Sequence, residues 1–133
     1  MKHQPYLMDT IQREIVLDAI QEACHWRKWS LLAVHVRSNH VHAVVDADRS
    51  PEQVMTAFKA YASRMLNGSL LDPPGLTRWA RHGSTRYLRD ADEISAAVGY
   101  VVSGQGEDMA VYDQAAEERP ERGEAFPGPR CPG

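Results

Sequence analysis

The sequence is poor in the features that define several classes of protein. It has no apolar run near the about 18 residues of a membrane span, and residues 1–5 contain no apolar signal region. Its two cysteines, Cys24 and Cys131, are too few for a disulfide framework or a zinc site. These absences predict a cytoplasmic protein with free thiols and no membrane partner.

The composition is that of one globular domain. Of the 133 residues, 43% are hydrophobic and 25% are charged, which excludes a wholly disordered chain. The net charge of −3 argues against bulk attraction to nucleic acid but leaves room for a local basic surface. Residues 113–133 hold four prolines and three glycines. We therefore expect a domain over residues 1–112 and a disordered tail over residues 113–133.

The predicted elements mix helices with short strands. Apolar residues at helical spacing predict helices over residues 10–26, 51–66 and 91–103, each preceded by a capping residue. Runs of β-branched residues predict strands over 31–36 and 41–45, paired as an antiparallel hairpin, and a third short strand over 85–88. This order predicts an α+β fold in which helices pack on a small antiparallel sheet.

A histidine pair is the strongest local signal for chemistry. His40 and His42 stand two residues apart at the start of the second predicted strand, so their side chains should project from the same face. Two imidazoles placed in this way can share one divalent ion, although they can also be two solvent-facing histidines. His35, on the neighbouring strand, is either a third ligand or, more simply, a structural residue.

Several segments together carry a resemblance to a known family. Residues 39–45 read Asn-His-Val-His-Ala-Val-Val, and further matches are the helix over 51–66, the segment 78–88 and the helix around Gly99-Tyr100-Val101-Val102. In this order they resemble the single-tyrosine HUH transposases, which include the REP-associated and the insertion-sequence-200-like transposases. The resemblance covers residues 6–112. It implies a ferredoxin-like fold, of which this chain would lack the first strand and so leave a sheet edge unpaired.

The resemblance also implies an activity and its residues. The family cuts single-stranded DNA with a tyrosine nucleophile, here Tyr100, and leaves a 5′-phosphotyrosyl link. A divalent ion, Mg²⁺ or Mn²⁺, would be held by His40 and His42. The family adds a polar ligand one helical turn after the tyrosine, where this chain has Gly104; Gln105 is the nearest replacement. It also implies a homodimer that places the tyrosine helix of one subunit against the histidines of the other.

The helical pattern agrees with an exposed Tyr100. Ile94, Ala97, Val98 and Val101 form one apolar face of the third predicted helix. Tyr100 lies about 110° from the centre of that face at about 100° per residue. A surface tyrosine without catalytic function remains the simpler interpretation when the family is left aside.

Basic and aromatic residues gather in one segment. The predicted contacts to single-stranded or hairpin DNA are Arg78, Trp79, Arg81, His82, Arg86 and Arg89, and Lys59 and Arg64 on the second helix could extend them. Arginines neutralise phosphates, and aromatic rings stack on bases. The alternative is a solvated strand edge with a buried tryptophan.

Two other functions stay open. One is a DNA-hairpin-binding remnant that has lost catalysis, because Gly104 and the missing strand leave the metal site incomplete. The other is a small metal-dependent hydrolase that uses His35, His40 and His42. Loss of activity on replacing Tyr100 separates the transposase from the hydrolase, and metal-dependent cleavage separates it from the remnant.

Overall fold

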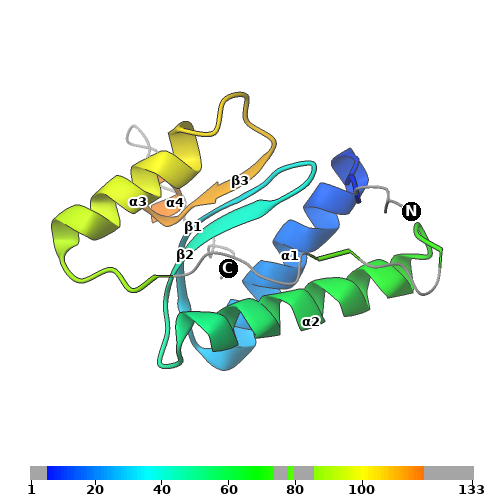
Figure 1. Cartoon of the computed structure of the whole chain (residues 1–133), viewed down its shortest axis with the longest axis horizontal. Helices are drawn as coiled ribbons and strands as arrows, with labels where there is room; N and C mark the ends of the chain where they lie inside the picture. Colours follow the sequence, from blue (N-terminus) through cyan, green and yellow to red (C-terminus); the bar gives the residue numbers. More distant parts are fainter. Residues whose placement is uncertain (1–5, 74–77, 80–85, 119–133) are drawn as a thin grey trace, which may run out of the picture.

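A small antiparallel sheet with helices on both faces forms the described part of the chain (Figure 1). The computed structural model describes residues 6–73, 78–79 and 86–118. Its elements are α1 (Thr10–Arg27), β1 (Ser30–Val36), β2 (Val41–Asp46), α2 (Pro51–Ser69), α3 (Ala91–Ser103), β3 (Ala110–Asp113) and α4 (Gln114–Glu118). This arrangement confirms the predicted α+β class. The ferredoxin-like detail stays a prediction.

Local capping fixes where the helices begin. At α1, the Asp9 side chain accepts from the Gln12 backbone N–H at 2.9 Å, and the Gln12 side chain accepts from the Asp9 N–H at 2.8 Å. Ser50 and Gln53 form the same reciprocal box at α2, and Asp90 caps α3 through the Glu93 N–H at 2.9 Å. Each box satisfies backbone donors that have no partner inside the helix. All three predicted helix starts are confirmed.

β1 is the central strand of the sheet. The strand order is β2-β1-β3, and both pairings are antiparallel. His35 lies opposite His42 on one side and opposite Val111 on the other. The predicted hairpin of β1 and β2 is therefore confirmed. In the described chain β2 pairs with β1 alone, and residues 6–9, which lead into α1, form no strand.

The third strand differs from the prediction. Residues 86–88 are not in a strand, and Thr85 lies outside the described residues. The second edge of β1 is taken instead by β3, in which Val111 and Tyr112 have the β-branched and aromatic side chains that suit a strand. Residues 113–118, which we expected in the tail, end β3 and form α4. Residues 119–133 lie outside the described residues.

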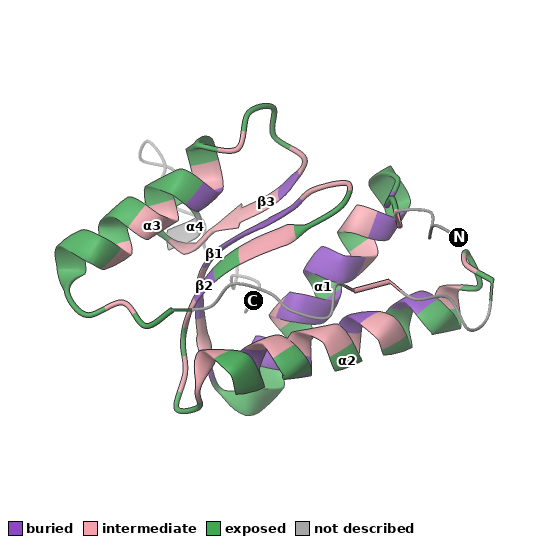
Figure 2. Ribbon diagram, viewed as in Figure 1, coloured by how far each residue is buried: buried purple, intermediate pink, exposed green. Residues whose placement is uncertain are grey.

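The two faces of the sheet bury very different amounts of apolar side chain. α1 and α2 cover one face. The main cluster there includes Val16, Ile20, Val34, Val36 and Leu66, and none of these residues is more than 2% exposed. α3 covers the other face over a smaller cluster of Ala33, Val44 and Val101. Figure 2 shows the contrast, with purple along α1 and β1 and mostly green on α3.

Asp72 joins the segment after α2 to the start of α1. Its carboxylate accepts from the Tyr6 hydroxyl at 2.7 Å, from Gln12 Nε2 at 2.8 Å and from Arg78 Nε at 3.0 Å. The side chains of Arg78 and Asp72 are only 5% and 6% exposed. Burial, and then the bond to Asp72, raise the pKa of Tyr6 to about 12. No helix among the described residues is long and apolar enough to cross a membrane.

Candidate active site

The two histidines of the pair lie side by side at the start of β2. Their ring centroids are 4.8 Å apart, and the ring planes are nearly perpendicular, at 88°. His42 shares its face of β2 with Val44, which packs in the cluster under α3. The strand geometry therefore turns the pair toward α3, as the spacing predicted for a shared face.

Asn39 orients the first imidazole. Its side-chain oxygen lies 2.6 Å from His40 Nδ1. An amide oxygen can only accept, so His40 donates through Nδ1–H and keeps the lone pair on Nε2. A metal-binding histidine commonly donates its other ring N–H to such an acceptor. Sequence reasoning used Asn39 only as part of the motif and missed this role, although its place directly before His40 is a readable signal.

The environment keeps the second imidazole neutral. Burial is the main cause that lowers the pKa of His42 below its usual value of 6.5, and the nearby His40, His35 and Arg37 lower it further. A neutral imidazole has a lone pair available for a metal ion. Both histidines therefore offer a nitrogen of the kind that divalent ions bind.

Tyr100 lies beside this pair within the same chain. The ring centroids of His42 and Tyr100 are 6.0 Å apart, in an edge-to-face arrangement at 84°. Tyr100 is 57% exposed, as the helical pattern predicted. One chain thus brings together Tyr100, His40 and His42.

His35 is a structural residue. It is fully buried, its Nδ1 lies 3.1 Å from the Val101 carbonyl, and its Nε2 accepts from the Met109 N–H at 2.9 Å. A carbonyl only accepts and a backbone N–H only donates, so Nδ1 carries the proton. Both nitrogens are occupied, and His35 connects β1 to α3 and to the start of β3. The hydrolase alternative needs His35 as a third metal ligand, and in this arrangement His35 has no free ring nitrogen to bind a metal.

Gln105 is turned back onto the helix that carries the tyrosine. α3 ends at Ser103, and Gly104 is its C-cap. Gln105 Nε2 donates to the Tyr100 carbonyl at 3.3 Å. Its role as a metal ligand stays a prediction.

The donor set fits a divalent ion bound by two imidazoles. His40 and His42 would hold it through ring nitrogens, with the remaining positions available to oxygen ligands such as phosphate and water. Among the residues that the structure describes, no group of three or more His, Cys, Asp and Glu side chains forms a metal site.

Part of the predicted DNA surface has another role. Arg78 is buried on Asp72, and Trp79 packs against the main core and donates from Nε1 to Ser63 Oγ at 2.7 Å. The Arg78 side chain is 5% exposed and Trp79 is partly buried, and their contacts to DNA stay a prediction. Arg81 and His82 lie outside the described residues. Arg86 and Arg89 are exposed immediately before α3.

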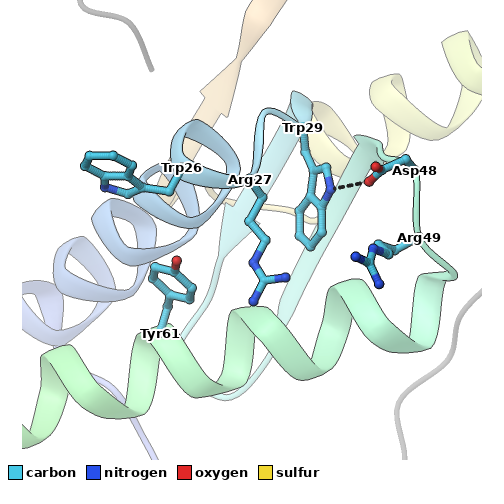
Figure 3. A pocket seen from close by; sticks show the side chains of 6 residues that line it. All are labelled: Trp26, Arg27, Trp29, Asp48, Arg49 and Tyr61. Carbon is cyan, nitrogen blue, oxygen red and sulfur yellow. Dashed lines mark hydrogen bonds between the residues drawn. The ribbon is translucent and has the colours of Figure 1, made fainter.

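The remaining predicted contacts lie on the other side of the sheet. Lys59 and Arg64 are on α2, and the Arg64 guanidinium stacks over the Tyr61 ring at 5.0 Å. Tyr61 also lines a cavity of about 300 Å³, together with Trp26, Arg27, Trp29, Asp48 and Arg49 (Figure 3). α2 packs on the face opposite α3. The structure therefore does not bring Lys59 and Arg64 together with the histidines and Tyr100.

Comparison with known proteins identifies the family. A family model described as Transposase IS200 like matches residues 2–82, which is more than half of the 133 residues. The chain therefore belongs to the IS200-like transposase family. Its partner is DNA, and its function belongs to DNA transposition. The match includes both histidines and ends before Tyr100. No curated protein and no solved structure matches the chain.

Proposed function

We propose that this protein cleaves and rejoins single-stranded DNA through a covalent tyrosine intermediate. The observation that carries the proposal is the exposed Tyr100 ring, 6.0 Å from His42, in a chain of the IS200-like transposase family. Tyr100 is the proposed nucleophile. His40 and His42 are the proposed ligands of Mg²⁺ or Mn²⁺, with Gln105 as the candidate third ligand.

The reaction balances as a transfer of one phosphoryl bond. The Tyr100 hydroxyl oxygen attacks the scissile phosphorus and loses its proton, while the bond from phosphorus to the 3′-oxygen breaks and that oxygen takes up a proton. The products are a 5′-phosphotyrosyl link and a free 3′-hydroxyl. Attack by a 3′-hydroxyl on the link reverses the step and releases Tyr100, so the strand can be rejoined without an outside energy source.

The side chains around Tyr100 have separate proposed roles in the reaction. A divalent ion at the histidines would supply positive charge to the phosphate oxygens. Asn39 holds His40 with Nε2 directed away from its own hydrogen bond, and burial keeps His42 neutral and able to coordinate. Arg86 and Arg89, exposed just before α3, would neutralise the DNA backbone near the tyrosine.

The test is covalent capture of DNA. Purified protein is mixed with labelled single-stranded hairpin DNA from the flanks of its own gene and Mn²⁺, and the adduct is measured on a denaturing gel. We expect an adduct that Tyr100→Phe and His40→Ala abolish. Tyr87→Phe is the matched control, because Tyr87 is also highly exposed, at 67%, and should leave the adduct unchanged. Salt-sensitive hairpin binding without any adduct would refute cleavage and favour the catalytically inactive hairpin-binding remnant.

Mixing two inactive variants tests whether the site is complete in one chain. The family resemblance implies a homodimer with shared sites, whereas Tyr100 and His42 of one chain are already in contact distance. We propose that each chain cleaves with its own tyrosine. A mixture of Tyr100→Phe and His40→Ala chains should then form no adduct. Restored adduct in the mixture would show that one subunit supplies the tyrosine and the other supplies the histidines.

A further inference from the structure

Gly104 closes α3 immediately beside the Tyr100 ring. Its N–H donates to the Tyr100 carbonyl at 2.8 Å. Its φ of −94° and ψ of 6° can be adopted by any residue, so its backbone does not require glycine. A Cβ atom at this position, however, would lie 2.8 Å from Tyr100 Cδ1 and 2.9 Å from the Tyr100 carbonyl oxygen. Space, rather than conformational freedom, is what glycine supplies here.

Gly99 provides the contrast within the same helix. It is the residue directly before Tyr100, and a Cβ built on it would meet nothing within 4 Å. The two glycines therefore flank the tyrosine in opposite situations. A methyl group at 99 has open space, whereas a methyl group at 104 collides with the tyrosine ring and with its backbone.

We propose that Gly104 is a positioning residue that sets the place of the Tyr100 ring against His42. The Tyr100 ring meets the His42 ring edge-to-face, and its Cδ1 is the atom that a Cβ at position 104 would meet first. With a Cβ present, the ring or the last helical turn must move until the 2.8 Å contact opens to the 3.4 Å at which ordinary contact begins. The catalytic consequence of this displacement rests on the proposed function; the positioning itself does not.

The steric contact and the family resemblance predict opposite effects of a polar side chain at position 104. The resemblance places a polar metal ligand one helical turn after the tyrosine, at the position of Gly104. On that basis, Gly104→Gln should repair the site. On steric grounds it should damage the site, because glutamine brings the colliding Cβ with it.

The first measurement is structural and does not depend on cleavage. Proximity of the Tyr100 and His42 rings is measured by nuclear Overhauser effects in protein with labelled tyrosine and histidine, with the Tyr100 signals assigned by their loss in Tyr100→Leu. We expect the same intensity in the natural chain and in Gly99→Ala, and a changed intensity in Gly104→Ala, because the effect depends steeply on the distance between the rings. An unchanged intensity in Gly104→Ala would overturn the proposal, whatever the activity.

The second measurement separates positioning from DNA binding. Under single-turnover conditions at saturating hairpin DNA, we expect Gly104→Ala and Gly104→Gln to form the adduct roughly 10-fold more slowly, because the displacement is smaller than the misplacement of about 1 Å that can cost about 100-fold. The dissociation constant for DNA and the rate of Gly99→Ala should not change. Faster adduct formation by Gly104→Gln would overturn the proposal. If the natural chain forms no adduct while the ring contacts change as expected, the proposed function fails and the positioning stands.

A comparison of melting temperatures tests whether Gly104→Ala acts through the Tyr100 ring or only destabilises the end of α3. The collision involves the tyrosine ring, so Gly104→Ala should lower the melting temperature less in a Tyr100→Ala chain than in the natural chain. An equal decrease in both backgrounds would mean that the ring is not what the Cβ meets, and would contradict the proposal.

Discussion

Replacing His35 with alanine should lower the free energy of unfolding by about 3 to 5 kcal/mol. His35 is fully buried and holds two backbone groups, the Val101 carbonyl at 3.1 Å and the Met109 N–H at 2.9 Å. A buried polar group that loses its partner costs about 1 to 3 kcal/mol, and the cavity left by the ring adds about 1 kcal/mol or more. Val101 belongs to the last turn of α3, where carbonyls lack partners within the helix.

Asparagine at position 35 should keep one of the two hydrogen bonds and so lose less stability than alanine. In His35→Asn, the side-chain NH₂ stands where Nδ1–H donates to Val101, but the shorter side chain cannot reach Met109. We therefore expect a loss of about 1 to 3 kcal/mol, between the natural chain and His35→Ala. The assay is urea unfolding followed by circular dichroism, with an unchanged dependence on urea showing that the unfolded state is comparable.

An exposed histidine serves as the control. His25 is exposed near the end of α1, so His25→Ala should change stability by no more than about 0.5 kcal/mol. A loss below about 1 kcal/mol for His35→Ala would refute the view that His35 connects β1 to α3 and β3. Equal losses for His35→Ala and His25→Ala would do the same.

Three further outcomes follow from buried or partly buried groups. Asp72→Ala should cost about 3 to 5 kcal/mol because it strands the buried Arg78 guanidinium; a double-mutant cycle with Arg78→Ala checks this and should show strong coupling. Burial raises the pKa of the Cys24 thiol to about 12, so in a Cys131→Ser chain a thiol reagent should react only at the rate of unfolding, and rapid modification of the folded protein would contradict it. Burial lowers the pKa of His42 below 6.5, so its neutral form adds stability above about pH 6.5 that is lost as the pH falls. His42→Gln should therefore lose less stability than the natural chain between about pH 7 and pH 5, and an NMR titration of His42 with a midpoint at or above 6.5 would disprove the shift.

Local signals were sufficient for much of the fold. The capping boxes at Asp9 and Ser50 and the start of α3 at Asp90 are set by residues three positions apart. The hairpin joins strands that follow one another directly along the chain. The histidine pair belongs to the same class, because the alternation of a strand alone places His40 and His42 on one face. Interactions of this range can be predicted from a single sequence.

Contacts between distant residues could not be predicted in this way. Arg78 looks like part of a basic surface until Asp72, Tyr6 and Asn67 are placed around it. The strand at Ala110–Asp113 has four residues and becomes a strand through pairing with β1, more than 70 residues earlier. The contact between the Tyr100 and His42 rings is likewise a tertiary contact. The helix pattern predicts that Tyr100 is exposed, but which residue it contacts depends on how α3 packs on the sheet.

The uneven burial on the two faces of the sheet has a consequence for hydrogen exchange. Within the described part of the chain, three buried residues, Ala33, Val44 and Val101, form the cluster at α3, whereas fifteen form the cluster at α1 and α2. Opening α3 alone therefore exposes far less apolar surface than opening the whole domain, and its free energy of opening should be correspondingly smaller. Amide protons of α3 should exchange through partial opening, while those of the central strand β1 exchange only on global unfolding. The helix that carries Tyr100 is thus the part of the fold that can detach from the sheet while the rest remains folded.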